Sequence, residues 1–245
     1  MRPARVLVTG GTDGIGLEVV RLLAARGASV VATGRRDGPD LPGVAWVRAD
    51  QSDPGAAART IAAACRDDLD AAILCAGTGT AATDGVEGAG AIRATLRVNL
   101  AASVLIAHAL APVLLARGGT LALVGSVARR GMGALPSYSA SKAGLHGFAR
   151  ALGEEWRGRA SVAMLHPGPT RTGMQGKAGM EVGRAARLFV PAPLMARMLL
   201  AEVDRAHGRR APRLATLGHG AAGRRWIAER IGVGRLARSA RARPS

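Results

Sequence analysis

The stretch T-G-G-T-D-G-I-G, residues Thr9–Gly16, decides how the first part of this chain folds. It follows an apolar, β-branched run over Ala4–Thr9 that is typical of a buried strand, and it precedes Leu17–Ala25, where apolar residues have helical spacing. Glycines at such a junction let the backbone approach an anion at the helix N-terminus, where free N–H groups and the helix dipole favour negative charge. The spacing is G-x-x-x-G-x-G, not the commoner dinucleotide pattern G-x-G-x-x-G, so alone it also fits a merely tight turn.

The alternation of strand and helix patterns continues along the chain. Short apolar runs predict further strands, and longer segments with helical spacing lie between most of them. Strands buried on both faces and separated by helices are typical of a doubly wound parallel sheet. We therefore expect an α/β fold with about seven parallel strands and helices on both faces. The expected strands cover 4–9, 29–32, 44–47, 71–74, 120–124, 162–165 and 214–217, and the further helices cover 54–65, 98–116, 139–156 and 191–206.

Two segments between these elements show no clear period. Residues 78–90 are rich in Gly, Ala and Thr and predict a surface loop. Residues 168–190 contain Met174 and Met180, which suits a lid over a variable ligand, although a disordered excursion fits the segment as well. One domain over 1–217 is the simplest organisation. The remaining residues, 218–245, form a basic C-terminal extension that we expect to be helical or partly disordered.

The net charge of +17 in 245 residues raises the question of a nucleic-acid partner. Residues 205–245 hold 11 arginines and one glutamate, so most of the excess belongs to the C-terminal end. We expect no nucleic-acid partner, and at most a weak contact of the extension with a membrane surface or an acidic partner. The apolar run Val98–Ala116 contains Asn99 and His108, which are costly inside a bilayer and favour a buried helix of a soluble protein.

The cysteines and the N-terminus bear on the compartment. Cys65 and Cys75 lie in apolar segments and form no pairing pattern, which favours a reducing environment. Arg2 and Arg5 lead directly into a strand-like run, which is not the pattern of a secretory signal. We expect a cytoplasmic protein, and nothing in the pattern of residues predicts a bound metal ion.

The single tyrosine of the chain, Tyr138, stands four residues before Lys142, one of only two lysines among 34 basic residues. On a helix, positions i and i+4 share a face. A free phenol titrates at about pH 10, and a fixed ammonium nearby favours the phenolate. The pair therefore suits proton transfer to or from a carbonyl or alcohol oxygen beside a hydride carrier. A helix-start tyrosine and a solvated lysine are the alternative interpretation.

The end of the second expected strand, Thr33-Gly34-Arg35-Arg36, bears on the cofactor. In dinucleotide-binding folds an acidic residue near this point binds the adenosine ribose 2′-hydroxyl, whereas arginine accommodates a 2′-phosphate. Arginine also matches phosphate oxygens in a bidentate way. Arg35 and Arg36 therefore favour NADPH over NADH, unless they are simply solvated surface arginines.

Together these residues resemble the short-chain dehydrogenase/reductase family, in its single-domain branch, over about residues 4–217. Thr9–Gly16 matches T-G-x-x-x-G-I-G, and Tyr138–Lys142, Y-S-A-S-K, matches Y-x-x-x-K. Ser126 supplies the hydroxyl expected after the fifth strand, and Asn99 the asparagine expected in the fourth helix. Pro167–Thr172 matches the proline-glycine turn followed by threonine. The resemblance implies a Rossmann-type fold and hydride transfer with a nicotinamide cofactor.

The resemblance also implies a role for each catalytic candidate. Tyr138 would be the general acid/base, and Ser126 would orient the substrate oxygen. Lys142 would hold the nicotinamide ribose hydroxyls and lower the pKa of Tyr138. Asn99 would fix a helix distortion and a water that links Lys142 to solvent.

The cofactor site implied by the resemblance draws on several segments. Asp50 would meet the adenine, and Thr172 would reach the carboxamide of the nicotinamide. The residues expected to bind the cofactor are Gly10, Thr12, Asp13, Gly14, Ile15, Gly16, Arg35, Arg36, Asp50, Ala76, Gly77, Asn99, Tyr138, Lys142, Pro167, Gly168, Thr170 and Thr172.

Three departures from the family pattern affect these expectations. Leu74-Cys75-Ala76-Gly77 replaces the frequent N-N-A-G, and we interpret Cys75 as a small buried hydrophobe. The loop from Ser126 to Tyr138 is about one residue shorter than usual, which would reshape the substrate mouth. Asp13 replaces a basic residue found in many NADPH-preferring members, so the cofactor prediction depends on Arg35 and Arg36.

The sequence therefore predicts an NADPH-dependent oxidoreductase that interconverts a small-molecule carbonyl and alcohol, as a homodimer or homotetramer. Helices 98–116 and 139–156 are the faces by which this family tends to pair. Two alternatives remain at this level: a non-catalytic dinucleotide-binding regulatory or scaffold protein, and a surface-binding protein that acts through its basic extension.

Overall fold

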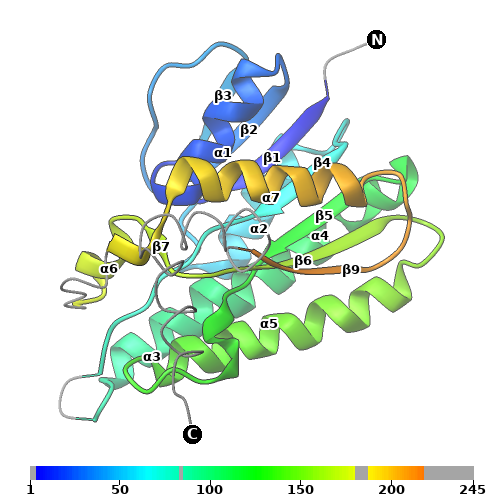
Figure 1. Ribbon diagram of the computed structural model, residues 1–245. Helices are drawn as coiled ribbons and strands as arrows, with labels where there is room; N and C mark the ends of the chain where they lie inside the picture. The colour runs from blue at the N-terminus through cyan, green and yellow to red at the C-terminus, as the bar shows by residue number, and fades with distance from the viewer. Residues whose placement is uncertain (1–3, 83–84, 180–186, 218–245) are drawn as a thin grey trace, which may run out of the picture.

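A parallel seven-stranded sheet forms the centre of the molecule in the computed structural model, which describes residues 4–82, 85–179 and 187–217 (Figure 1). The strand order is β3-β2-β1-β4-β5-β6-β9, and every pairing is parallel. This confirms the expected doubly wound α/β fold. The strands are β1 (Arg5–Thr9), β2 (Ser29–Gly34), β3 (Val44–Arg48), β4 (Ala71–Leu74), β5 (Thr120–Val124), β6 (Ser161–Pro167) and β9 (Arg213–Leu217).

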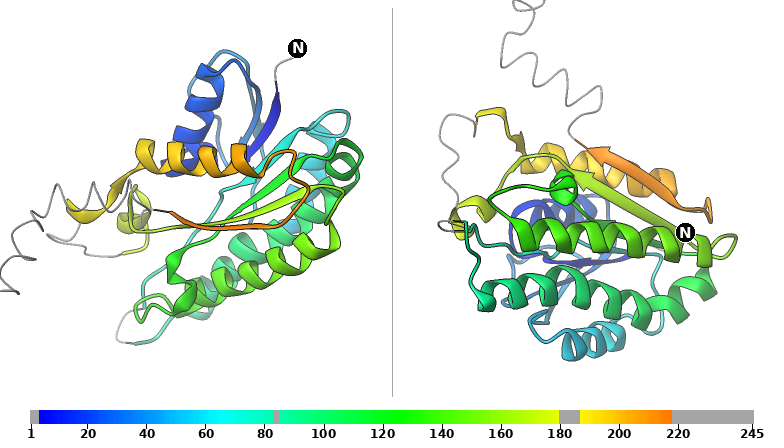
Figure 2. Two further views of the ribbon diagram at one scale, coloured as in Figure 1. Left: turned by 45° about the vertical axis from the view of Figure 1, so that its right-hand side comes forward. Right: turned by 90° about the horizontal axis from the view of Figure 1, so that it is seen from below.

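Helices cover both faces of the sheet (Figures 1 and 2). Alternate side chains of a strand point to opposite faces, so Leu7 enters one apolar core while Val6 and Val8 enter the other. The helices on the Leu7 face are α2 (Pro54–Ala64), α4 (Ala102–Arg117) and α5 (Pro136–Glu155), and those on the opposite face are α1 (Gly14–Ala25) and α7 (Ala192–Ala206). Both cores consist mainly of Ala, Val, Leu and Ile, as the low aromatic content predicts.

Several helix boundaries follow from local chemistry and differ from the predicted ones. The helix expected from residue 139 begins at Pro136, because proline is favoured in a first helical turn, and Tyr138 therefore lies within α5. The helix expected from residue 98 is preceded by α3 (Ala89–Leu96) and a π-helical turn, Arg97–Ala101. Gly118, with φ of 62°, ends α4 in the left-handed conformation.

The segment after β6 is more ordered than its sequence pattern predicts. Short strands β7 (Thr170–Arg171) and β8 (Val190–Pro191) pair in parallel, and α6 (Met174–Lys177) follows β7. Residues 180–186, which include Met180 of the predicted lid, lie outside the described residues. The predicted basic extension, 218–245, lies outside them too.

The helical run Ala89–Arg117 is, within the described ranges, the one helix whose length and composition would allow it to cross a membrane. Its inner face carries Ile106, Leu110 and Leu114, which are fully buried against α2 and the sheet. On its outer face Leu105 is 42% exposed. This packing places the inner face of the helix in the apolar core on that side of the sheet.

Candidate active site

The predicted site residues gather at the carboxyl edge of the sheet, where ligands of doubly wound folds bind. The Gly-rich turn follows β1, Arg35 and Arg36 follow β2, and Asp50 follows β3. Ala76 and Gly77 follow β4, Ser126 follows β5, and the residues from Pro167 onwards end β6 and follow it. The helices supply the remaining candidates, Asn99, Tyr138 and Lys142.

The Gly-rich turn forms a cradle that only glycine can build. Gly10 and Gly14 have φ of 66° and 54°, a conformation that other residues rarely adopt. A Cβ on Gly10 would lie 2.7 Å from the Ala76 Cα atom, and one on Gly16 would lie 2.2 Å from the Gly10 carbonyl oxygen. The turn therefore packs its backbone closely against Ala76, just after β4, and leads directly into the N-terminus of α1, an arrangement that fits a pyrophosphate.

Thr9, the first residue of the motif, links the turn to β4. Its buried hydroxyl accepts hydrogen bonds from the N–H groups of Cys75 and Ala76, at 3.1 and 3.3 Å. Burial raises the pKa of the Cys75 thiol to about 11, so the thiol is protonated at neutral pH. This environment agrees with the interpretation of Cys75 as a small apolar residue rather than a nucleophile.

The Tyr138 phenol is half-buried, and burial is the main influence on its titration. Burial raises the pKa of Tyr138, and a hydrogen bond with Ser126 acts less strongly in the opposite direction. The net direction is opposite to the lowering expected from Lys142. In this structure the phenol is therefore protonated at neutral pH and can donate a proton.

Lys142 is 3% exposed, and its ammonium lies 5.7 Å from the centroid of the Tyr138 ring. Its Nζ donates a hydrogen bond of 2.9 Å to the carbonyl oxygen of Val124, the last residue of β5. Burial lowers the pKa of Lys142 to about 8. The structure thus holds a buried cation between α5 and the end of β5, one helical turn from the phenol.

Ser126 has its hydroxyl oriented by the backbone that follows it. Its Oγ accepts a hydrogen bond of 3.1 Å from the N–H of Ala128 and so caps a 3₁₀ turn, Val127–Arg130. Because that bond occupies an acceptor position of the oxygen, the hydroxyl proton is free to donate towards Tyr138.

Asn99 sits at the centre of the π-helical turn and is fully buried. Its Oδ1 accepts from the N–H of Thr78, and its Nδ2 donates to the Thr78 carbonyl oxygen, each at 2.8 Å. Nδ2 also lies 3.0 Å from the hydroxyl of Ser141. A Cβ on Gly77 would lie 3.5 Å from both Asn99 Oδ1 and Lys142 Nζ, so these atoms border the same small space. The predicted helix distortion is therefore present at Asn99.

The structure adds site residues that the sequence patterns did not identify. Ser141, inside Y-S-A-S-K, donates a hydrogen bond of 2.7 Å to the Tyr138 carbonyl oxygen. Gly79 packs on the Tyr138 ring, since a Cβ there would lie 3.1 Å from the ring carbon Cδ2. Glu87 accepts two hydrogen bonds of 2.9 Å, from the N–H and the hydroxyl of Ser137. Only Ser141 has a signal in the sequence, because it lies within the motif.

Arg35 and Arg36 are exposed and form no ion pair among the residues that the structure describes. The neighbouring carboxylate, Asp37, pairs instead with Arg48 at 2.7 Å. That pairing lowers the pKa of Asp37. The guanidinium groups of Arg35 and Arg36 thus remain available for a phosphate.

The segment after β6 reaches back to the Gly-rich turn. A Cβ on Gly14 would lie 3.3 Å from Thr172 Cγ2, and Lys177 of α6 forms an ion pair with Asp13. Asp13 also caps α1 by accepting from the Gly14 N–H at 2.7 Å. The hydrogen bond from Lys177 is the main reason that the pKa of Asp13 is lowered.

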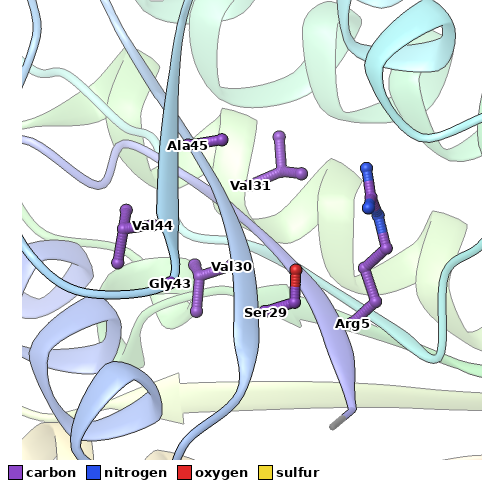
Figure 3. A pocket seen from close by; sticks show the side chains of 7 residues that line it. All are labelled: Arg5, Ser29, Val30, Val31, Gly43, Val44 and Ala45. Carbon is purple, nitrogen blue, oxygen red and sulfur yellow. The ribbon is translucent and has the colours of Figure 1, made fainter. Parts of the chain in front are cut away.

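Two depressions lie at the opposite, amino edge of the sheet. One, of about 330 Å³, opens over the first residues of β1, β2 and β3, including Arg5, Ser29 and Val44 (Figure 3). The other, of about 390 Å³, lies between β1, β4 and α7 and includes Val6, Asp70 and His207. Neither contains a predicted site residue, so the carboxyl edge remains the candidate site.

Comparison with known proteins agrees with this geometry. The chain matches the family model described as short chain dehydrogenase over residues 4–182. It is 30% identical over 197 residues to a 3-oxoacyl-[acyl-carrier-protein] reductase of Mycobacterium bovis, covering 76% of this chain and 77% of that protein. It is 29% identical over 209 residues to an uncharacterized oxidoreductase of Escherichia coli, covering 78% and 82%.

Solved structures show the same fold. A short-chain dehydrogenase from Sphingobium yanoikuyae, in complex with NADPH, has a TM-score of 0.73 at 22% identity and covers 99% of this chain and 97% of its own. A candidate NAD(P)-dependent gluconate 5-dehydrogenase from Beutenbergia cavernae, with bound NADP, has a TM-score of 0.75 at 27% identity and covers 86% and 94%. The chain belongs to the short-chain dehydrogenase family of oxidoreductases.

Proposed function

We propose that this protein reduces a carbonyl group of a small molecule to an alcohol, with NADPH as the hydride donor and Tyr138 as the proton donor. The observation that carries the proposal is the half-buried phenol of Tyr138, which interacts with Ser126 and has the buried ammonium of Lys142 5.7 Å from its ring centroid. A nicotinamide cofactor bound at the carboxyl edge would supply the hydride. The chain's own residues would orient the carbonyl and deliver the proton.

The protonation state of Tyr138 at neutral pH fits the proposed direction of the reaction. A phenol that stays protonated at neutral pH is ready to act as a general acid towards a carbonyl oxygen. The Ser126 hydroxyl points towards Tyr138, so both groups can hydrogen-bond the same oxygen. Lys142 places a positive charge one turn away, which stabilises the phenolate that forms when the proton leaves.

NADPH is proposed over NADH because of the charges at the ends of β1 and β2. Arg35 and Arg36 are unpaired in the described chain, and the nearby Asp37 is held by Arg48. The acidic Asp13 is neutralised by Lys177. A 2′-phosphate would thus meet arginines whose charge is not already compensated. The NADPH and NADP in the solved relatives agree with this preference.

The test is Tyr138→Phe, preceded by a search for a substrate. Loss of NADPH in the presence of a panel of ketones and aldehydes identifies a reducible carbonyl. We expect Tyr138→Phe to lower kcat by at least about 100-fold, because the proton donor is gone. The affinity for NADPH, measured by fluorescence titration, should stay within about twofold. Full activity in Tyr138→Phe would show that the proposed mechanism is wrong.

The assembly and location of the protein remain proposals. We propose a homodimer or homotetramer that pairs through α4 and α5, in the cytoplasm, which size-exclusion chromatography with light scattering and cell fractionation would test. A purely regulatory or scaffold role is not favoured, because Tyr138, Lys142, Ser126 and Asn99 are all present and brought together.

A further inference from the structure

Two histidines, His146 and His166, contact each other close to the segment that carries Ser126. His146 lies on α5 and His166 lies near the carboxyl end of β6, and their Nδ1 and Nε2 atoms are 3.0 Å apart. Their ring centroids are 5.0 Å apart. The proposed reaction uses neither residue. The contact nevertheless joins the helix that carries Tyr138 to the strand beside Ser126.

His146 continues the face of α5 that carries the proposed catalytic pair. Residues 138, 142 and 146 are separated by four positions each, so they form one stripe with steps of about 6 Å along the helix axis. A link between His146 and β6 therefore restrains the rotation of α5 about its axis. That rotation sets the direction in which the Tyr138 phenol points.

His166 packs directly against the residue before Ser126. The Gly125 N–H donates to the Leu165 carbonyl oxygen at 2.7 Å, which extends the β5–β6 pairing to this point. A Cβ on Gly125 would lie 2.5 Å from His166 Nδ1, so glycine is needed to make room for the ring. His166 thus fixes where β5 ends and where Ser126 begins.

The placement of His166 is not explained by stability. Its ring is 2% exposed, and within the described residues its Nδ1 lacks a partner of good hydrogen-bond geometry, the Ser126 backbone being close enough only to act weakly on the ring's pKa. Burying a polar atom without a partner costs free energy. A buried apolar side chain would avoid that cost, so stability alone does not account for an imidazole at this position.

The surroundings keep the pair neutral. The pKa of His166 is lowered to about 4, by burial first and then by the positive charge of Arg129, His146 and Lys142, while the Ser126 backbone acts in the opposite direction. Burial, Arg129 and Arg150 also lower the pKa of His146. Two neutral imidazoles can share one N–H and one lone pair, whereas two protonated ones would place N–H against N–H.

We propose that His146 and His166 form a positioning pair that fixes Ser126 relative to Tyr138. The two hydroxyls come from different elements, β5 and α5, and they must hold the same substrate oxygen. The pair ties those elements together through β6. This inference depends on the proposed function, because it assigns Ser126 and Tyr138 a shared oxygen.

The first test compares three variants with the wild type on the carbonyl identified above. His146→Leu removes the hydrogen bond, His146→Gln retains a donor, and Arg59→Leu is a control that replaces an exposed polar side chain on α2, outside the site and the proposed α4–α5 interface. We expect His146→Leu to lower kcat about tenfold, since small misplacements of catalytic groups are costly, with KM and the affinity for NADPH within about twofold. His146→Gln should recover most of the activity, and Arg59→Leu should match the wild type.

The second readout does not need turnover. Tyr138 is the only tyrosine of the chain, so the ultraviolet absorbance of phenolate reports its ionisation alone. The hydrogen bond from Ser126 opposes the rise of the Tyr138 pKa, so Ser126→Ala should raise that pKa further. His146→Leu should raise it in the same direction by a smaller amount, and His146→Gln should leave it unchanged. Circular dichroism over the same pH range follows the fold of each variant.

The outcomes separate this inference from the proposed function. If His146→Leu matches Arg59→Leu in kcat and in the Tyr138 titration while Ser126→Ala changes both, the pair has no positioning role. If Ser126→Ala also changes neither, the proposed partnership of Ser126 and Tyr138 is wrong, and the proposed function fails with it. A reduced kcat with a raised Tyr138 pKa in His146→Leu supports the pair.

Discussion

The buried charge of Lys142, which the proposed reaction uses, lowers the stability of the folded chain. Its ammonium is 3% exposed and makes one described protein hydrogen bond, to Val124. The lowering of its pKa from 10.5 to about 8 means that the folded chain binds its proton less tightly than the unfolded chain does. At about 1.36 kcal/mol per pKa unit, the buried charge costs roughly 3 kcal/mol below pH 8.

We predict that Lys142→Met abolishes carbonyl reduction and yet stabilises the fold at pH 7. Loss of the hydrogen bond to Val124 offsets about 1 kcal/mol of the gain, which leaves about 2 kcal/mol and a Tm higher by several degrees. The stability of the wild type should rise with pH between about 8 and 10.5, where the unfolded chain still binds the proton and the folded chain does not. Melting curves across that window should lack this rise in the variant; a lower Tm for Lys142→Met at pH 7 would contradict the prediction.

Gly79 is the second residue whose identity the site constrains. A Cβ at this position would approach the Tyr138 ring to 3.1 Å, closer than ordinary van der Waals contact, so the ring would have to shift by a few tenths of an ångström. We predict that Gly79→Ala lowers kcat about tenfold with little change in the affinity for NADPH. The matched control is Gly90→Ala in α3, where a Cβ meets nothing within 4 Å and should stabilise the helix by roughly 0.5–1 kcal/mol. Steady-state kinetics and thermal melts on both variants would check this, and equal kcat values would refute it.

At the scale of elements, α6 contributes a residue to the Gly-rich turn. Lys177 of α6 contacts Asp13 of that turn, although 164 positions separate them in the sequence. The sequence places a carboxylate, Asp13, where many NADPH-preferring members of the family have a basic residue. The structure supplies the missing positive charge from Lys177, the second of only two lysines in the chain. Because both side chains are exposed, the ion pair itself contributes little to stability. Its effect should appear in binding.

We predict that Lys177→Met weakens NADPH binding about threefold to tenfold, because the carboxylate of Asp13 is then uncompensated beside the phosphates. Asp13→Asn combined with Lys177→Met removes both charges and should recover most of the affinity. Titrations monitored by NADPH fluorescence at low and high salt would measure both variants, and the single-variant defect should shrink as salt rises. If the double variant binds no better than Lys177→Met, the two charges are not coupled.

At the scale of the whole molecule, the site and the basic excess lie in different parts of the chain. All described site residues fall between Thr9 and Lys177, whereas residues 218–245 hold seven arginines and one glutamate. We predict that deletion of 218–245 leaves NADPH affinity and kcat within about twofold of the full chain. Retention on heparin or on anionic vesicles should fall, with a weaker dependence on salt, because fewer counterions are released. Loss of NADPH binding on deletion would show that the extension belongs to the site.

Much of the fold follows from the local pattern. The seven strands of the main sheet were predictable because each is a short, mostly apolar run, and the helices between most of them favour parallel pairing; the short strands β7 and β8 were not predicted. The helix over Ala89–Leu96 was not, because Gly88-Ala89-Gly90 resembles a loop and no side chain caps it. Its helical state depends on continuity with the helical turn after it and on packing against α5, neither of which a local sequence pattern predicts.

The sequence by itself determined the chemistry of the site: a phenol and an ammonium four residues apart, and glycines where a strand meets a helix. These are local requirements, since helical spacing and backbone sterics act within a few residues. Only the tertiary structure decided which residues, distant in the sequence, contact the site residues. Lys177 reaches Asp13, Gly79 meets Tyr138, and His166 meets His146 across different elements. Such contacts arise when segments far apart in the chain are brought side by side by the pairing of the strands. The local sequence around one residue of a pair therefore does not predict its partner.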